Sequence, residues 1–160
     1  MNRFAATTDS QAVVPADREA IWAAITDPEV LPRLTPLLRH ITVCQDGDET
    51  GDLWRWELTR IPVLGVSISP SFTERMRFDA PARIDYTHEP PPGRHERTSA
   101  EGWYVLTEVS GGTHLRISLT LTVELPLARA AAPAVRRVMG TVMAVTGDRF
   151  ADNLMRHLAG

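Results

Sequence analysis

The chain has 160 residues, of which 43% are hydrophobic and 23% charged, and its net charge at pH 7 is −3. A chain of this length buries roughly 70% of its unfolded surface around one core, so we expect a single domain over residues 1–160. The negative charge gives no basic surface for nucleic acid, and no apolar run reaches the roughly 18 residues of a membrane span. The N-terminal segment has no apolar signal region, and the lone Cys44 cannot form an internal disulfide. We therefore expect a cytoplasmic protein.

The chain begins with a predicted strand that leads directly into a helix. Residues 3–14 alternate weakly and end in β-branched residues, which is typical of a strand. Asp17 follows, and its side chain can accept a hydrogen bond from the free amides of a first helical turn. The residues behind it place an apolar stripe on one helix face: Ile21, Ala24 and Ile25.

Three prolines interrupt this helical segment at Pro28, Pro32 and Pro36. Each removes an amide donor and disfavours helical geometry in the residue before it. We therefore expect two short helices at an angle, which together close the open end of a curved structure.

Alternation of apolar and polar residues then predicts about six successive antiparallel strands. In chain order they cover residues 39–46, 52–60, 66–78, 84–89, 94–109 and 114–125. Pro70 lies within the third of them and suggests a bulge or an edge position. The last strand has one apolar and one polar face, so only one face of the sheet is expected to be buried.

From about residue 126 the apolar period changes to that of a helix of roughly 25 to 30 residues. Its apolar positions are Val135, Val138, Met139, Val142, Phe150, Leu154 and Leu158. Gly140 and Gly147 lie inside it, where they weaken the helix and suggest a kink or the close approach of a backbone or a ligand. This helix is the only element long enough to cover the apolar face of the sheet, so the chain is predicted to have an α+β fold.

The element order resembles that of the START-like or SRPBCC superfamily, whose fold is called a helix grip. The segments that carry the resemblance are VPADREAIWAAITDPEVL, the hairpin GGTHLRISLTL and the terminal RFADNLMRHL. The resemblance implies a curved antiparallel sheet of about seven strands wrapped around a long C-terminal helix, with two short helices after the first strand. It also implies a cavity between sheet and helix. Relatives include lipid and quinone carriers and polyketide cyclases or aromatases.

Glu74 is the most unusual candidate residue. By strand parity it shares a face with Phe72, Met76 and Phe78, so its carboxyl points to the side that should be buried. A buried carboxyl must find a cation, become neutral or mark a functional site. An ion pair with an arginine on a neighbouring strand and a functional acid both remain open.

Other candidates could line the implied cavity. Tyr86, His88 and Tyr104 could form a polar spot, although sheet aromatics and an exposed histidine account for them at least as well. The two tryptophans and the helix methionines could form apolar walls, although core packing is their default interpretation. The ligand-binding candidates are Trp54, Trp56, Phe72, Glu74, Met76, Tyr86, His88, Tyr104, Leu119, Met139, Val142 and Met143.

No common catalytic motif is present. The sequence has no HExxH, GxSxG, P-loop or dinucleotide-binding glycine pattern, so catalytic residues cannot be assigned. The loop HEPPPGRHE gathers His88, Glu89, His95 and Glu96, but without a recognised ligand spacing, and we interpret it as a solvated polar loop. Cys44 is interpreted as a structural thiol. We expect no metal and no cofactor.

These features favour binding of a hydrophobic small molecule, such as a lipid, a quinone or a polyketide-like compound, without chemistry on it. One alternative is a polyketide cyclase or aromatase, with Glu74, Tyr86 and His88 as candidate acids or bases. Another is a structural or interaction module with a filled core and no cavity, which could form a homodimer. Fold alone does not decide among them.

Overall fold

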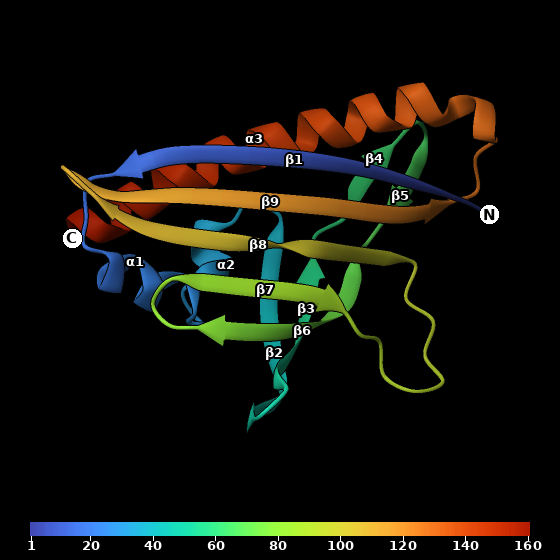
Figure 1. Cartoon of the computed structure of the whole chain (residues 1–160). Coiled ribbons are helices and arrows are strands. Elements are labelled where there is room, and N and C mark those ends of the chain that lie inside the picture. Colours follow the sequence, from blue (N-terminus) through green and yellow to red (C-terminus); the bar gives the residue numbers. More distant parts are fainter.

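The computed structural model describes all residues 1–160 (Figure 1). The elements in chain order are β1 (Asn2–Val14), α1 (Arg18–Ile25), α2 (Leu31–Leu34), β2 (Leu38–Asp48), β3 (Gly51–Leu58), β4 (Ile61–Val63), β5 (Val66–Ile68), β6 (Ser71–Asp79), β7 (Arg83–His88), β8 (Thr98–Val109), β9 (Gly112–Leu125), a short 3₁₀ helix (Arg129–Ala131) and α3 (Ala132–Ala159).

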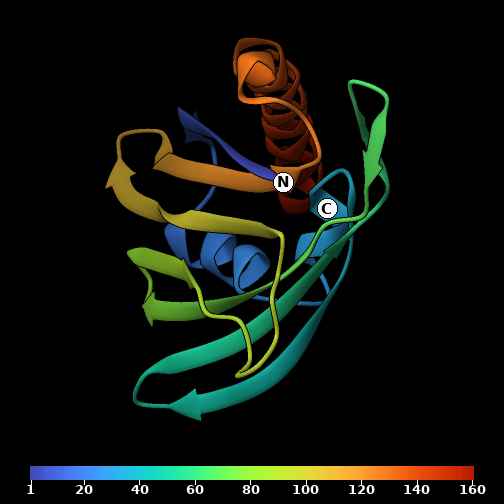
Figure 2. The same ribbon diagram turned by 90° about the vertical axis from the view of Figure 1, so that its right-hand side faces the viewer.

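Seven antiparallel strands form the main sheet in the order β1-β9-β8-β7-β6-β3-β2. Strands β2 to β9 follow one another as a meander, apart from β4 and β5, and β1 joins the free edge of β9. The sheet curves, and α3 runs along its concave side (Figures 1 and 2). The predicted α+β helix-grip fold is confirmed.

The predicted single strand over residues 66–78 is wrong. The segment is divided at Pro70: β5 pairs with β4 in a separate two-stranded sheet, and β6 begins at Ser71. A two-residue turn joins β4 to β5, and both of its residues have positive φ, +48° at Leu64 and +81° at Gly65. Such turns match the twist of a hairpin, so the chain leaves the main sheet and returns to it within a few residues.

The other boundary correction concerns the strand predicted over residues 94–109, which begins only at Thr98. The four residues before it belong to the loop from β7. That loop is held against the sheet by side-chain contacts, described below, that no alternation could reveal.

The two short helices after the first strand are present, as predicted. Asp17 is the N-cap residue of α1, but its side chain makes no capping hydrogen bond, which corrects the expectation. Its backbone carbonyl instead accepts hydrogen bonds from the amides of Ala20 and Ile21. The helices lie inside the curve of the sheet (Figure 2), where Asn153 Nδ2 of α3 donates to the Leu34 carbonyl at 3.0 Å.

The apolar core consists of two clusters along α3. The larger cluster, of 16 buried residues, joins α1, α2 and the sheet to Phe150 and Leu154. The smaller cluster, of 6 buried residues, joins the first half of α3 to β1, β4 and β9. Gly140 and Gly147 lie on the exposed side of α3, and a Cβ at either would have no heavy atom within 4 Å, so the suggested close approach of a backbone is wrong. No helix combines the length and the apolar character needed to cross a bilayer.

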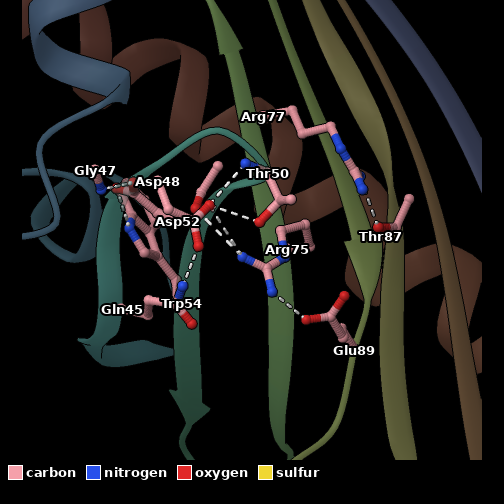
Figure 3. A network of polar contacts seen from close by, with 11 residues as sticks. Gln45, Gly47, Asp48, Thr50, Asp52, Trp54, Arg75, Arg77, Thr87 and Glu89 are labelled. Atoms are coloured by element: carbon pink, nitrogen blue, oxygen red, sulfur yellow. Dashed lines mark hydrogen bonds and ion pairs between the residues drawn. The ribbon is translucent and has the colours of Figure 1, made fainter.

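A polar network on the face of the sheet opposite α3 fixes the strands that carry the site (Figure 3). Arg75 donates to the Gly51 carbonyl at 3.3 Å, at the start of β3, and forms an ion pair with Glu89, just after β7. Asp48 lies 4.0 Å from the same guanidinium and accepts the Thr50 amide at 2.7 Å. Arg75 thus ties the β2–β3 turn to the end of β7 across β6.

Candidate functional site

Glu74 lies on the concave face of the sheet. It is on β6, opposite Trp54 of β3 and His88 of β7, and its relative exposure is 0%. The fully buried Met76 and the buried Phe72 flank it on the same strand face. The carboxyl group is therefore on the buried side that strand parity indicates.

Only one oxygen of the Glu74 carboxyl has a partner. The Ala100 amide of β8 donates to Oε1 at 3.0 Å, whereas Oε2 is buried with no hydrogen-bond partner. The alternative of an ion pair with an arginine on a neighbouring strand does not hold, because Glu74 takes part in none of the ion pairs of the structure. The site therefore holds a buried acid with no compensating cation.

Burial raises the pKa of Glu74 to about 9. The Ala100 amide lowers this pKa, while the nearby carboxylates of Glu101 and Glu96 raise it further. Desolvation disfavours the charged form of any carboxyl, and here no opposite charge offsets it. Glu74 is thus protonated at neutral pH and its side chain is a potential hydrogen-bond donor.

Beside Glu74, the loop after β7 is held to the sheet by Glu96. Thr73 donates to the two Glu96 oxygens, from its amide at 2.8 Å and from Oγ1 at 2.8 Å. His88 Nε2 lies 2.9 Å from Glu96 Oε1. The Glu96 side chain is only 2% exposed, so the interpretation of the loop as wholly solvated is wrong for this residue. The single sequence contains no signal of this, because the loop has no periodic pattern.

The remaining residues of this loop have separate partners. Glu89 pairs with Arg75, and His95 Nε2 lies 2.8 Å from Glu124 Oε2. His88 and Glu96 contact each other, whereas Glu89 and His95 have partners elsewhere, so the four side chains form no common ligand set. No group of three or more histidine, cysteine, aspartate or glutamate side chains is arranged to hold a metal ion. The predicted structural thiol Cys44 is exposed on β2.

Two tyrosines pack together on the neighbouring strands. The Tyr86 and Tyr104 ring centroids lie 5.8 Å apart, and Tyr86 donates its hydroxyl to the Ser118 carbonyl at 3.2 Å. Gly102 makes room for this contact, since a Cβ there would lie 2.7 Å from the Tyr86 oxygen. Burial raises the pKa of Tyr86, and raises that of Tyr104 to about 12. Both phenols therefore stay neutral.

Aromatic rings line the adjacent part of the concave face. Trp54 is fully buried, and its indole donates to Asp52 at 3.2 Å. Trp56 stacks on Phe72, with centroids 6.4 Å apart and planes 14° from parallel. The Trp56 Nε1 atom is buried and has no hydrogen-bond partner.

An apolar pocket of about 40 Å³ lies between the sheet, the β4–β5 hairpin and α3. Its lining residues are Leu58, Ile61, Val63, Ile68, Pro70, Thr98, Leu121, Val123, Val138, Met139 and Val142. Met139 and Val142 are among the predicted site residues, whereas Met143 is buried and Leu119 packs against the larger core cluster. The hairpin side chains were missed, because strands of three residues carry no usable period.

The register of the strands places this pocket close to Glu74. Thr98 lines the pocket, and Ala100, two residues further along β8, is the residue that donates to Glu74. Two residues along a strand span about 7 Å. Along β3 and β6, the stacked pair of Trp56 and Phe72 lies between Glu74 and the pocket residues Leu58 and Pro70.

A wider hollow of about 580 Å³ lies at the molecular surface between the start of β1 and the start of α3. Arginine side chains at Arg3, Arg129 and Arg136 contribute to its walls. It shares no lining residue with the apolar pocket, so it is separate from the interior around Glu74.

Comparison with known proteins gives a family and a fold. Residues 5–158 match the family described as polyketide cyclase / dehydrase and lipid transport. A START superfamily protein from Mycobacterium smegmatis is similar in structure, with a TM-score of 0.68 and 16% identity over 96% of this chain and 97% of that one. The Zhui aromatase/cyclase from Streptomyces sp. R1128 gives a TM-score of 0.69 and 13% identity over 97% of this chain and 94% of that one.

A search of curated proteins by sequence finds no match. The family model nevertheless covers nearly the whole chain, and the solved structures share its sheet and long terminal helix at low identity. The chain therefore belongs to the family described as polyketide cyclase / dehydrase and lipid transport, and it shares its fold with the START superfamily protein.

Proposed function

We propose that this protein binds a hydrophobic small molecule between the concave face of the sheet and α3, beside Glu74. The observation that carries the proposal is the Glu74 carboxyl, which is fully buried, has no cation and leaves one oxygen without a partner. Leaving a polar group unpaired in an interior costs about 1–3 kcal/mol. A carboxyl retained at such a cost suggests a ligand that completes its hydrogen bonding. The family assignment supports the same proposal.

Binding would require the interior to open. Pockets for small molecules typically measure about 300–1,000 Å³, far more than the pocket of about 40 Å³ found here. Two features favour opening toward Glu74. The β4–β5 hairpin forms part of the wall and is separate from the main sheet. The Trp56–Phe72 stack lies between the pocket and Glu74, and its rings could separate to admit a ligand.

The neutral fluorescent probe N-phenyl-1-naphthylamine tests this proposal, because its emission rises in apolar sites. We expect a saturable rise with one probe per chain. Val142→Phe should weaken binding at least about tenfold by filling the pocket, since Val142 is part of its lining. Val145→Phe is the matched control on the same helix, where Val145 is 48% exposed and outside the pocket. No saturable binding, or equal losses in both variants, would contradict the proposal.

The small pocket volume favours a second candidate, a structural or interaction module with a filled core. Absence of probe binding in the wild-type protein would support that candidate. The buried acid itself favours a third, a cyclase or dehydrase in which Glu74 protonates a bound polyketone. Glu74→Gln separates the carrier from the enzyme. It would spare binding in both, but an enzyme would form product from a polyketone in the wild type and lose it in the variant, whereas a carrier would form no product in either.

A further inference from the structure

Two unpartnered polar atoms belong to side chains on the concave face of neighbouring strands. Four buried side-chain nitrogen or oxygen atoms have no hydrogen-bond partner, on Arg18, Arg55, Trp56 and Glu74. Arg18 belongs to α1, and Arg55 alternates with the tryptophans and so points away from the concave face. The Trp56 indole nitrogen and the Glu74 oxygen remain, both on the concave face of neighbouring strands.

The strand register brings these two groups near each other. Trp56 pairs with Phe72, and Glu74 is two residues further along β6, so the two side chains are diagonal neighbours. Such neighbours lie about 7–8 Å apart. An indole and a glutamate side chain are long enough for both to reach one ligand atom placed between them. The Tyr86 hydroxyl, on the neighbouring strand β7, already donates to the Ser118 carbonyl.

Both groups can act as donors toward the same atom. An indole N–H can only donate, and a protonated carboxyl has one O–H to donate. No cation accompanies them, because Arg75 and Arg77 alternate with Glu74 and their contacts are to Glu89 and Thr87 on the opposite face (Figure 3). A charged carboxylate or phosphate would therefore be desolvated here without a counter-charge, whereas an uncharged acceptor would not.

We propose that the ligand carries an uncharged oxygen acceptor, such as a ketone carbonyl, held jointly by the Trp56 indole N–H and the Glu74 carboxyl O–H. This inference rests on the proposed function and adds the chemistry of the ligand to it. Trp56 and Glu74 then act as the specificity-determining pair, while the pocket lined by Val142 and Met139 holds the apolar part of the ligand.

The test uses two probes of nearly the same shape. 9-Fluorenone has a carbonyl where fluorene has a methylene group. We expect the wild-type protein to bind 9-fluorenone about tenfold more tightly than fluorene by calorimetry, as two added hydrogen bonds would give. In ¹H–¹⁵N spectra, the Trp56 indole resonance, assigned by its loss in Trp56→Phe, should move downfield with 9-fluorenone but not with fluorene.

Two variants locate the preference. Trp56→Phe and Glu74→Met should each reduce 9-fluorenone affinity several-fold and leave fluorene affinity nearly unchanged. Trp103→Phe is the matched control, because the Trp103 ring contacts the Arg83 and Arg116 guanidinium groups, each 5.3 Å from its centroid, and belongs to neither the pocket nor the pair. Equal affinity for the two probes, or no shift of the Trp56 resonance, would overturn the inference while leaving the proposed function intact. Failure of both probes to bind would contradict the proposed function itself.

Discussion

Glu74 makes the stability of this protein dependent on pH. Its pKa is about 9 in the folded chain against an ordinary value of 4.5, so between these values the folded chain holds a proton that the unfolded chain has lost. The contribution of this proton to the free energy of unfolding is fully present below the pKa of the unfolded chain, and it is lost as the pH rises toward the pKa of the folded chain. Between the two pKa values the free energy of unfolding falls by about 1.4 kcal/mol per pH unit.

We expect Glu74→Gln to remove this dependence, because glutamine keeps the shape and the acceptor for the Ala100 amide but cannot ionise. The variant should therefore be more stable than the wild type at pH 8, and the difference should shrink by at least about 2 kcal/mol at pH 5. Urea unfolding at the two pH values measures both free energies of unfolding. Glu49→Gln, at an exposed position in the β2–β3 turn, is the control. A difference that does not vary with pH would show that Glu74 ionises normally in the folded protein.

How far single residues can be predicted from sequence depends on whether they belong to a pattern. Glu74 could be placed on the buried face because β6 alternates regularly. Glu96 could not, because it reaches Thr73 from an irregular loop. The unpartnered Trp56 nitrogen could not be predicted either, since hydrogen-bond satisfaction depends on packing across several elements.

At the scale of elements, the β4–β5 hairpin is the main feature that sequence patterns missed. Its strands have three residues each, too few for a period, and Pro70 is equally compatible with a bulge in one long strand. The long helix and the existence of the other strands were predictable because each follows one regular period, although the strand that ends in β6 was predicted too long and β8 begins later than predicted. The hairpin matters to function because Ile61, Val63 and Ile68 line the apolar pocket.

The turn of this hairpin offers a direct test. Leu64 has φ of +48° and is 47% exposed, so its side chain contributes little packing while its backbone is strained. Leu64→Asn should stabilise the protein by about 1 kcal/mol, because asparagine tolerates this region. Gly65→Ala should destabilise it by a similar amount because its φ of +81° strains alanine; the cost is backbone strain alone, since a Cβ there would meet nothing within 4 Å. Thermal unfolding measures both, and a destabilised Leu64→Asn would show that the leucine side chain is needed.

Helix α3 is expected to be indispensable to the folded state. Its buried side chains are Val135, Met139, Met143, Phe150 and Leu154. Each is worth about 1.5–3 kcal/mol when buried, and together they rival the about 5–15 kcal/mol that stabilises a typical domain. Removing residues 134–160 should give an aggregated or molten chain by size-exclusion chromatography and near-ultraviolet circular dichroism. A truncated chain that stays monomeric and unfolds cooperatively would contradict this.

At the scale of the whole molecule, the fold was predictable and the volume of its interior was not. The order of elements and the resemblance to START-like proteins indicated a sheet wrapped around a helix, with a cavity between them. The pocket found there is only about 40 Å³, because α1, α2 and the aromatic rings of the sheet fill most of the space. Cavity volume depends on the packing of side chains from every element at once, which no local pattern specifies.

The central claim is that Glu74 is an uncharged acid in an interior that admits an apolar ligand. The ¹³C resonance of its side-chain carboxyl, assigned by its loss in Glu74→Gln, reports both parts of this claim in one titration. We expect the resonance to keep the position of a protonated carboxyl through pH 7 and to shift when 9-fluorenone is added to saturation. Titration near the ordinary value of 4.5, or a resonance unchanged by the bound probe, would contradict the account.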